Sequence, residues 1–253
     1  MKRKLLFLTS IIIFFNFIPQ DSFAQDYYLK AFLGIGKDPN YLFNSNNDPA
    51  SAGNLGTGSN FGIAVSRTII QNLSGEMDFS YFTSKAGYDL NGDNGLISSS
   101  VNSSAQMLRY IPSLIYTIIK DHSITPYIKA GFVLGIYGQE SNNILFIDLD
   151  HVAQRNMYIA TKRLGGIGTG ALIEAGCDLL LGNNFSFSIS PYYLAEWKNY
   201  KTLEYTNSTV NGAPSMLSQN PLYPQQINAY NLFHTIGIDL GMKYSFGKKK
   251  ITP

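Results

Sequence analysis

The residues of this sequence whose types could do chemistry are few and scattered. The densest group is the run FIDLDH, in which Asp148, Asp150 and His151 combine two carboxylates with an imidazole. Such a set could bind a divalent cation or transfer protons in an acid–base reaction. The other interpretation, which we favour, is a solvated loop that carries charge without a reactive role.

The remaining candidate groups lack the spacing that their chemistry requires. His122 and His234, with His151, are the only histidines, and they form no metal-ligand pattern. Cys177 stands between Gly176 and Asp178, neighbours that do not acidify a thiol. The glycine-rich run before it lacks the Lys followed by Ser or Thr of a phosphate-binding loop. We therefore expect no catalytic residue, no cofactor and no metal site.

The N-terminus has the layout of a secretory signal peptide. Three cations precede an apolar stretch of 14 residues from Leu5 to Ile18, and a polar region ends in Ser22, Phe23 and Ala24. The stretch is too short for a typical membrane-spanning helix. We expect cleavage after Ala24, so that residues 1–24 are the signal peptide, 25–246 the folded domain and 247–253 a short basic tail.

Removal of the signal peptide leaves a neutral chain. The full sequence has 19 Lys and Arg and 17 Asp and Glu, and residues 1–24 contain three of the cations and one of the anions. The mature chain then has 16 of each, so nothing indicates a nucleic-acid partner. A single cysteine also rules out an internal disulfide.

The dominant pattern in the mature chain is strict alternation of apolar and polar residues, which predicts β-strands. The last such run, Thr235 to Phe246, is about twelve residues long, which is the length of a tilted strand that crosses a bilayer. Eight segments show this pattern, at residues 27–36, 59–67, 73–82, 105–118, 124–137, 169–181, 185–198 and 235–246.

The predicted connections alternate in length. Those near residues 69–72, 120–123 and 182–184 are tight, whereas residues 37–58, 83–104, 138–168 and 199–231 are long and rich in Asn, Ser, Gly and Asp. Short turns at one end and long loops at the other are typical of outer-membrane barrels. The sequence therefore predicts an all-β fold, an eight-stranded antiparallel up-and-down transmembrane barrel. Pro112 and Pro191 fall inside strands, where we expect bulges.

Almost all the charge of the predicted strands lies on one face. Because lipid cannot hydrate a charge, that face must point into the barrel. It carries five cations and six anions: Lys30, Glu76, Asp78, Arg109, Lys129, Glu174, Asp178, Glu196, Lys198, Asp239 and Lys243. The interior of so narrow a barrel is filled by side chains. We expect an ion-pair plug that includes Lys30, Glu76, Asp78, Arg109, Lys129, Glu174, Asp178, Asp239 and Lys243.

Aromatic residues gather near the predicted strand ends, where they would meet the lipid head groups. They are Tyr27, Tyr116, Phe185, Trp197, Tyr244 and Phe246.

The run DLGMKYSF resembles the C-terminal assembly signal of Gram-negative outer-membrane barrels, with Asp239, Gly241, Tyr244 and Phe246 at its marked positions. IPSLIY and TPYIKAGFVLGIY are similar to strands of the small OmpA-like, OmpX-like and OmpW-like barrels. The resemblance implies location in the outer membrane and recognition of those four residues by the barrel insertion machinery.

Three functions remain open for such a barrel. The first is a non-enzymatic role in adhesion, envelope structure or contact with an unidentified surface ligand or protein. The second is a narrow porin-like channel for small or hydrophobic solutes. The third is a lipid-modifying enzyme, because the rim acids and His151 resemble the placement of catalytic residues in some small barrels.

Overall fold

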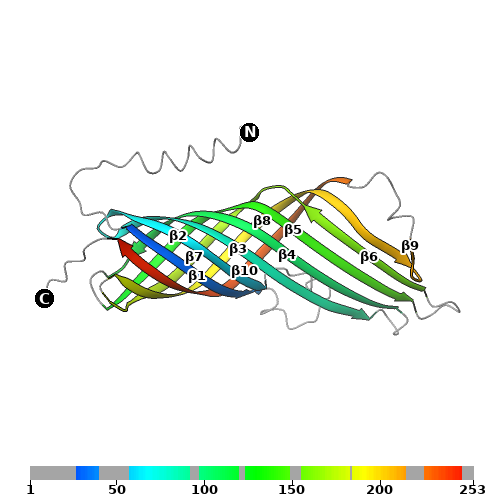
Figure 1. The fold of residues 1–253 in the computed structure, drawn as a ribbon, viewed down its shortest axis with the longest axis horizontal. Coiled ribbons are helices and arrows are strands. Elements are labelled where there is room, and N and C mark those ends of the chain that lie inside the picture. Colours follow the sequence, from blue (N-terminus) through cyan, green and yellow to red (C-terminus); the bar gives the residue numbers. More distant parts are fainter. Residues whose placement is uncertain are drawn as a thin grey trace.

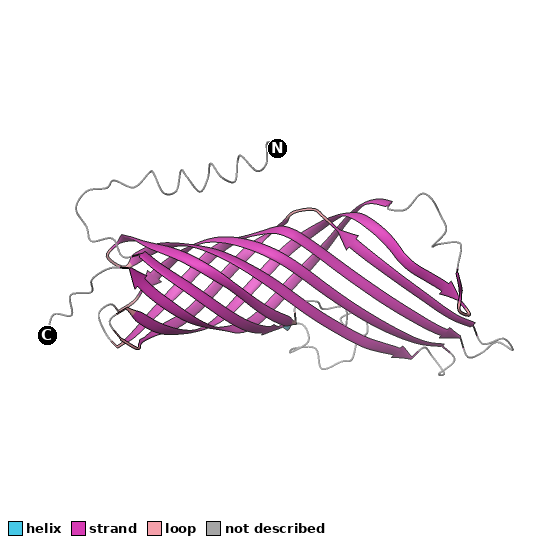
Figure 2. Ribbon diagram, viewed as in Figure 1, coloured by secondary structure: helices cyan, strands magenta, loops and turns pink. Residues whose placement is uncertain are grey.

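The computed structural model describes residues 27–39, 57–91, 97–119, 123–148, 155–182, 184–214 and 225–246. Nearly all of them lie in strands of one antiparallel sheet (Figure 2). No helix among these residues is long and apolar enough to cross a bilayer.

The sheet closes into a barrel through its first and last strands. β1 (Tyr27–Lys37) pairs with β10 (Gln225–Phe246) from Tyr27 opposite Phe246 to Lys37 opposite Ile236. On its other side β1 pairs with β2 (Gly58–Ile70), which is followed by β3 (Leu73–Asn91), β4 (Ile97–Thr117) and β5 (Ile124–Asp148). β8 (Phe185–Val210) pairs with β10 and completes the ring (Figure 1).

The position between β5 and β8 is shared by two strands. β6 (Arg155–Leu164) pairs with the outer half of β5, and β7 (Gly168–Leu180) with its inner half. The break contains Gly165 and Gly166, whose φ angles of 76° and 75° are left-handed and favour glycine. Because β6 and β7 together fill one strand position in the ring, the barrel has eight strands. The predicted fold is thus confirmed.

The strands are longer than the sequence analysis predicts. Much of the residue ranges 83–104, 138–168 and 199–231, expected to be loops, is paired: β3 and β4 stay in register as far as Asn91 opposite Ser98. β8 turns at Asn211 and Gly212, both with positive φ, into the short β9 (Ala213–Pro214). Polar composition suggested loops here, but both faces of these strands lie outside the membrane and need no apolar residues.

These extensions form a wall on one side of the barrel. β1 ends at Lys37 and β2 begins at Gly58, whereas β4, β5 and β6 continue far beyond them (Figure 1). β5 and β6 remain paired to Asp148 opposite Arg155, and β6 and β8 to Met157 opposite Val210. Backbone pairing therefore continues well outside the apolar belt.

The expected bulges at Pro112 and Pro191 are wrong. Met77 faces Pro112 and Ile238 faces Pro191 without any shift of register. On their other sides the pairing of β4 with β5 and of β7 with β8 is interrupted next to each proline, because proline has no N–H to donate. The bulge in β5 lies instead at Ile136, where Leu108 faces Tyr137 but Arg109 faces Gly135.

The outer surface of the barrel carries an apolar belt. Outward side chains along β1, β4 and β10, such as Leu33, Leu114 and Leu240, are large, apolar and exposed. On β4 the belt extends from Leu108 to Tyr116, and polar residues such as Gln106 and Asn102 take over on the wall. Nine residues of tilted strand match the span of a bilayer, and the exposed surface is thus suited to lipid.

We predict that Leu240→Arg destabilises the folded barrel by about 2–4 kcal/mol, because it places a charge near the middle of the belt. The measurement is urea-induced unfolding in lipid vesicles. Asn143→Arg, on the exposed polar part of β5, is the control and should change stability by less than about 0.5 kcal/mol. Equal effects of the two substitutions would show that the Leu240 face does not contact lipid.

Candidate functional site: the filled interior and the outer wall

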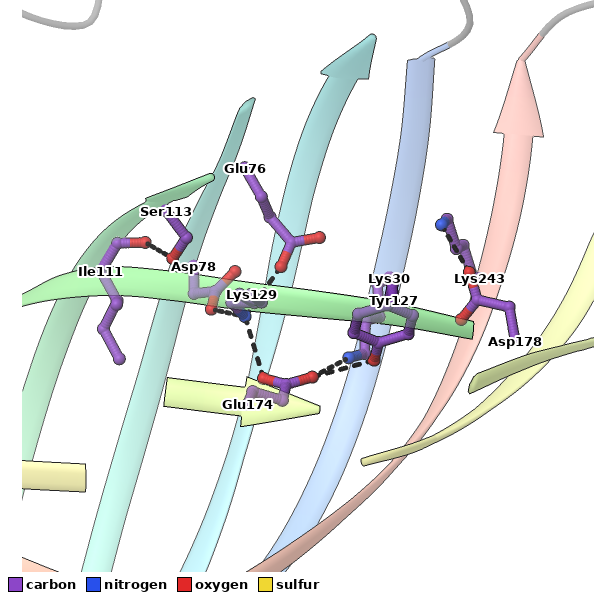
Figure 3. Close-up of polar contacts among 10 residues, drawn as sticks. All are labelled: Lys30, Glu76, Asp78, Ile111, Ser113, Tyr127, Lys129, Glu174, Asp178 and Lys243. Carbon is purple, nitrogen blue, oxygen red and sulfur yellow. Dashed lines mark hydrogen bonds and ion pairs between the residues drawn. The ribbon is translucent and has the colours of Figure 1, made fainter. Parts of the chain in front are cut away.

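The centre of the interior is a cluster around the amine of Lys129 on β5. Its Nζ atom lies 2.5 Å from Asp78 Oδ2 and 2.8 Å from Glu76 Oε1, both on β3, and 3.3 Å from Glu174 Oε2 on β7 (Figure 3). All four side chains are buried. One cation therefore holds carboxylates from two strands that are not neighbours of each other.

Glu174 extends this cluster across the lumen to β1. Its Oε1 atom is 3.5 Å from Lys30 Nζ on β1 and accepts a hydrogen bond of 2.9 Å from the Tyr127 hydroxyl (Figure 3). A buried carboxylate is tolerated only when charges and hydrogen bonds replace water. Here β1, β3, β5 and β7 are all joined across the lumen by side chains.

A separate ion pair lies closer to the end where β1 begins and β10 ends. Lys243 Nζ is 2.7 Å from Asp178 Oδ2, and it also lies 4.3 Å from the centre of the Tyr28 ring. These residues line a cavity of about 70 Å³ whose walls include hydroxyl groups of Ser186 and Ser245. This end of the lumen is thus a small polar vestibule.

A second buried ion pair lies further along the lumen, toward the end of the barrel that carries the wall. Arg109 Nε donates to Glu196 Oε2 at 2.7 Å, and the guanidinium carbon is 4.4 Å from the centre of the Phe82 ring. Lys198 is also fully buried and bonds the carbonyl oxygens of Gly135 and Gly166 at 3.4 and 3.3 Å. Glu196 and Lys198 were expected on the inner face but not in the plug.

Two apolar layers separate the polar ones. One lies between the Lys129 cluster and Arg109 along β4 and consists of Ile111, Val133, Leu172, Tyr192 and Leu194. The other lies beyond Arg109 and consists of Phe82, Ala105, Met107, Tyr200 and Phe233. All ten side chains are buried. Apolar constrictions of this kind oppose the passage of ions and water.

The wall carries a further ion pair that the sequence analysis missed. Arg163 Nη1 on β6 is 3.0 Å from Glu140 Oε1 on β5, and Asn142 donates to the same oxygen at 2.8 Å. Both charged residues lie in the range that was expected to be a loop. Only the pairing of Glu140 with Arg163 in adjacent strands, which the sequence does not display, reveals them as a site.

The nine predicted plug residues all lie on the inner face, but they do not form a single cluster. Asp239 is buried, and among the described residues it has no ion pair within 4 Å. Its Oδ1 atom, like Ser188 Oγ, has no hydrogen-bond partner in the described part of the chain. Buried polar atoms of this kind are the usual partners of internal water.

The residues of the expected assembly signal divide between the two faces of β10. Asp239 and Gly241 face inward, where Gly241 lies against Ser188 and Lys30. Tyr244 packs edge to face on Phe185 and on Phe246, with ring centres 4.9 and 4.8 Å apart. Recognition of these four residues by the insertion machinery stays a prediction.

The reactive candidates are placed only in part. Asp150, His151 and His122 lie outside the described residues, and Asp148 ends β5 with a side chain that is not described. His234 is on the outer face of β10, with Nδ1 2.7 Å from the Tyr193 hydroxyl, and Cys177 is partly buried on β7. No group of His, Cys, Asp or Glu in the described ranges could hold a metal ion.

Comparison with solved structures finds small barrels of bacterial outer membranes. Neisserial surface protein A is 14% identical over 90% of this chain and all of its own, with a TM-score of 0.38. A major outer-membrane protein of Thermus thermophilus is 15% identical over 88% of this chain and all of its own, with a TM-score of 0.36. The outer-membrane protein OprG of Pseudomonas aeruginosa is 12% identical over 88% of this chain and 96% of its own, with a TM-score of 0.37.

No protein-family model and no curated protein sequence matches the chain. The assignment of the fold therefore stands on the strand pairing, the apolar outer belt and the charged interior. Together these features define an integral barrel of the bacterial outer-membrane type.

We predict that Lys129→Met destabilises the barrel by about 3–5 kcal/mol, because three buried carboxylates lose the cation that they share. Lys243→Met is the matched control. This substitution should lower the free energy of unfolding by less than about 1 kcal/mol, because the side chains of Lys243 and Asp178 are both partly exposed. The free energies of unfolding of both variants are measured in urea, with the heat-dependent change in gel mobility as the signal for folded protein.

The loss in free energy of unfolding caused by Lys129→Met should shrink on acidification, because protonated carboxylates no longer repel one another. A deficit that stays constant between neutral and acidic pH would show that the loss is one of packing and not of charge.

Proposed function

We propose that the protein is a non-enzymatic, non-conducting barrel of the bacterial outer membrane that presents its wall to a partner at the cell surface. The observation that carries this proposal is the contrast between the two parts of the molecule. The membrane part is filled by buried ion pairs and apolar layers. The wall is a paired sheet with exposed polar side chains such as Asn102 and Asn143.

A paired sheet suits a contact surface better than a loop does. Its backbone is already ordered, so a partner that binds it need not offset the entropy of ordering a flexible segment. The Glu140–Arg163 pair and the bond from Ser103 Oγ to Asn142 Oδ1, at 2.6 Å, join neighbouring strands of the wall. We therefore assign adhesion or another surface interaction to the wall, with its partner still to be identified.

A narrow channel is the second candidate. It is favoured by the vestibule next to Lys243 and by the buried polar atoms that need water, such as Asp239 Oδ1. Conduction would require the two apolar layers to separate. An enzymatic role has less support, because His234, the only histidine among the described residues, bonds the hydroxyl of Tyr193 on the outer face and not a serine or cysteine.

Conductance of the refolded mature protein in a planar bilayer decides between these candidates. We predict no discrete openings, because Tyr192 and Phe82 are buried in the apolar layers that close the lumen. A heat-dependent shift of gel mobility confirms that the barrel has folded, and a general porin in the same membrane is the positive control. Discrete openings from the folded protein would contradict the proposal and support the channel.

Shortening the wall tests the role of the surface. Gly87 and Asn102 face each other on β3 and β4, so replacement of residues 87–102 by Asn-Gly closes a shorter hairpin without changing the register below it. Cells that display the intact protein should adhere to at least one member of a panel of immobilised matrix proteins and polysaccharides. Cells with the shortened wall should adhere several-fold less.

The control for this experiment is the double variant Leu108→Ile and Leu114→Ile, which alters the same strand within the lipid belt. It should adhere as the natural protein does. Equal adhesion by the shortened variant, with the barrel folded, would show that this hairpin is not the contact surface.

A further inference from the structure

The inner half of the plug contains more negative than positive side chains. It extends from the vestibule to the apolar layer that includes Tyr192, and Arg109 lies beyond that layer. Among the described residues, five carboxylates and three amines point into this part of the lumen, which leaves two negative charges unmatched. They are Glu76, Asp78, Glu174, Asp178 and Asp239, with Lys30, Lys129 and Lys243, and Figure 3 shows all of them except Asp239.

Asp239 is the carboxylate of this group that lacks an ion pair. Each of the other four lies within 4 Å of an amine. Asp239 is only 6% exposed, yet its Oδ1 atom accepts no hydrogen bond in the described part of the chain. The charged groups that face it across the lumen all have other partners, and they are Lys30 on β1, Arg109 on β4, Lys129 on β5 and Glu174 on β7. A carboxylate buried in this way needs a further positive charge to compensate it.

Glycines make room beside this carboxylate. A Cβ atom at Gly34, the β1 partner of Asp239, would overlap Asp239 Oδ1. A Cβ atom at Gly241 would press on Ser188 Oγ, and Ser188 is the β8 partner of Gly241. Ser188 is fully buried, and its hydroxyl has no hydrogen-bond partner among the described residues. A carboxylate oxygen and a hydroxyl oxygen, both unpartnered, thus face the same part of the lumen.

The vestibule leads toward these two oxygens. Its lining includes Ser186, the inward residue of β8 that precedes Ser188, and Ser245 on β10. The Ser245 hydroxyl is buried and has no partner in the described ranges either. The cavity of about 70 Å³ has room for several water molecules. It lies at the end of the barrel where β1 begins and β10 ends, which faces the periplasm in barrels of this type.

We propose that Asp239 and Ser188 form a binding site for one small monovalent cation, such as Na⁺, that enters from the periplasm. Carboxylate, hydroxyl and water oxygens are the ligands that hard cations prefer, and the vestibule supplies the water. A single carboxylate suits one positive charge, and no cluster of acids in the described ranges could hold a divalent ion. A proton would neutralise Asp239 but leave Ser188 Oγ without a partner.

The site is closed on its far side. The apolar layer of Ile111, Val133, Leu172, Tyr192 and Leu194 lies between it and the wall end of the lumen. The cation therefore binds and returns to the periplasm without crossing the membrane.

The dependence of folding stability on Na⁺ provides the test. The mature protein is folded in zwitterionic vesicles, and its unfolding in urea is measured while choline chloride is replaced by NaCl at constant ionic strength. Choline is too bulky for a site between side chains. A ligand that binds only the folded protein stabilises it by mass action. Once the Na⁺ concentration exceeds the dissociation constant, each tenfold rise should lower the unfolding equilibrium constant about tenfold.

The variant Asp239→Asn keeps the shape of the side chain and removes its charge, so its stability should no longer depend on the choice of Na⁺ or choline. Ser188→Ala should shift the dependence to several-fold higher Na⁺ concentrations, because one ligand is lost. The matched control is Glu140→Gln, a buried carboxylate of the wall that is paired with Arg163. Whatever its own stability, it should keep the Na⁺ dependence of the natural protein. The heat-dependent gel shift verifies that each variant folds.

A Na⁺ dependence that persists in Asp239→Asn would overturn the proposed site. Equal stability of the natural protein in Na⁺ and in choline, at both neutral and alkaline pH, would show that a proton compensates Asp239 and would overturn the proposal. A stronger effect of Mg²⁺ than of Na⁺ at equal ionic strength would overturn the choice of a monovalent ion. None of these results depends on whether the wall binds a partner or the barrel conducts.

Discussion

The ion cluster around Lys129 is the interaction on which the rest of the structure depends. A barrel of eight strands has an interior only wide enough for side chains, and those side chains cannot be charged unless their charges are matched. Lys129 reaches two carboxylates on β3 and one on β7, and Glu174 continues the network to Lys30 on β1. Strands that share no hydrogen bonds are thereby held at fixed separations.

This constraint explains why the membrane part of the barrel has its charged residues inside and its apolar residues outside. Because the charges are satisfied inside, the outer face can be apolar, and residues such as Leu33, Leu114 and Leu240 point outward from the membrane strands. Glycines such as Gly135 and Gly168 make room for the large side chain of Glu196, which a Cβ atom at either position would meet. Beyond the belt neither face needs to be apolar, so the strands continue as a polar wall whose stability comes from pairing.

Much of this arrangement can be predicted from the sequence. A period of two over eight segments predicts the strands, and the position of Lys30, Glu76, Arg109 and Lys129 on one face predicts that they point inward. The sequence does not predict which charges meet, because that depends on the tilt and register of strands far apart in the chain. Arg109 meets Glu196 on β8, and Asp239 meets no cation within 4 Å among the described residues.

The wall was missed for a different reason. Residues such as Ser98 to Ser104 have the composition of a loop, and only their pairing with β3 and β5 shows that they are extended. The bulge at Ile136 could not be predicted either, because no proline marks it, and proline interrupts a ladder without adding a residue.

A double-mutant cycle between Lys129 and Asp78 tests the central claim most directly. Unfolding free energies of the natural protein, Lys129→Met, Asp78→Asn and the double variant in lipid vesicles give the coupling between the two side chains. The account predicts a favourable coupling of about 2–3 kcal/mol, because Lys129→Met leaves the buried carboxylate of Asp78 without its cation, and Asp78→Asn removes that carboxylate. A coupling below about 0.5 kcal/mol would contradict it, since the two groups would then not act together in holding the barrel.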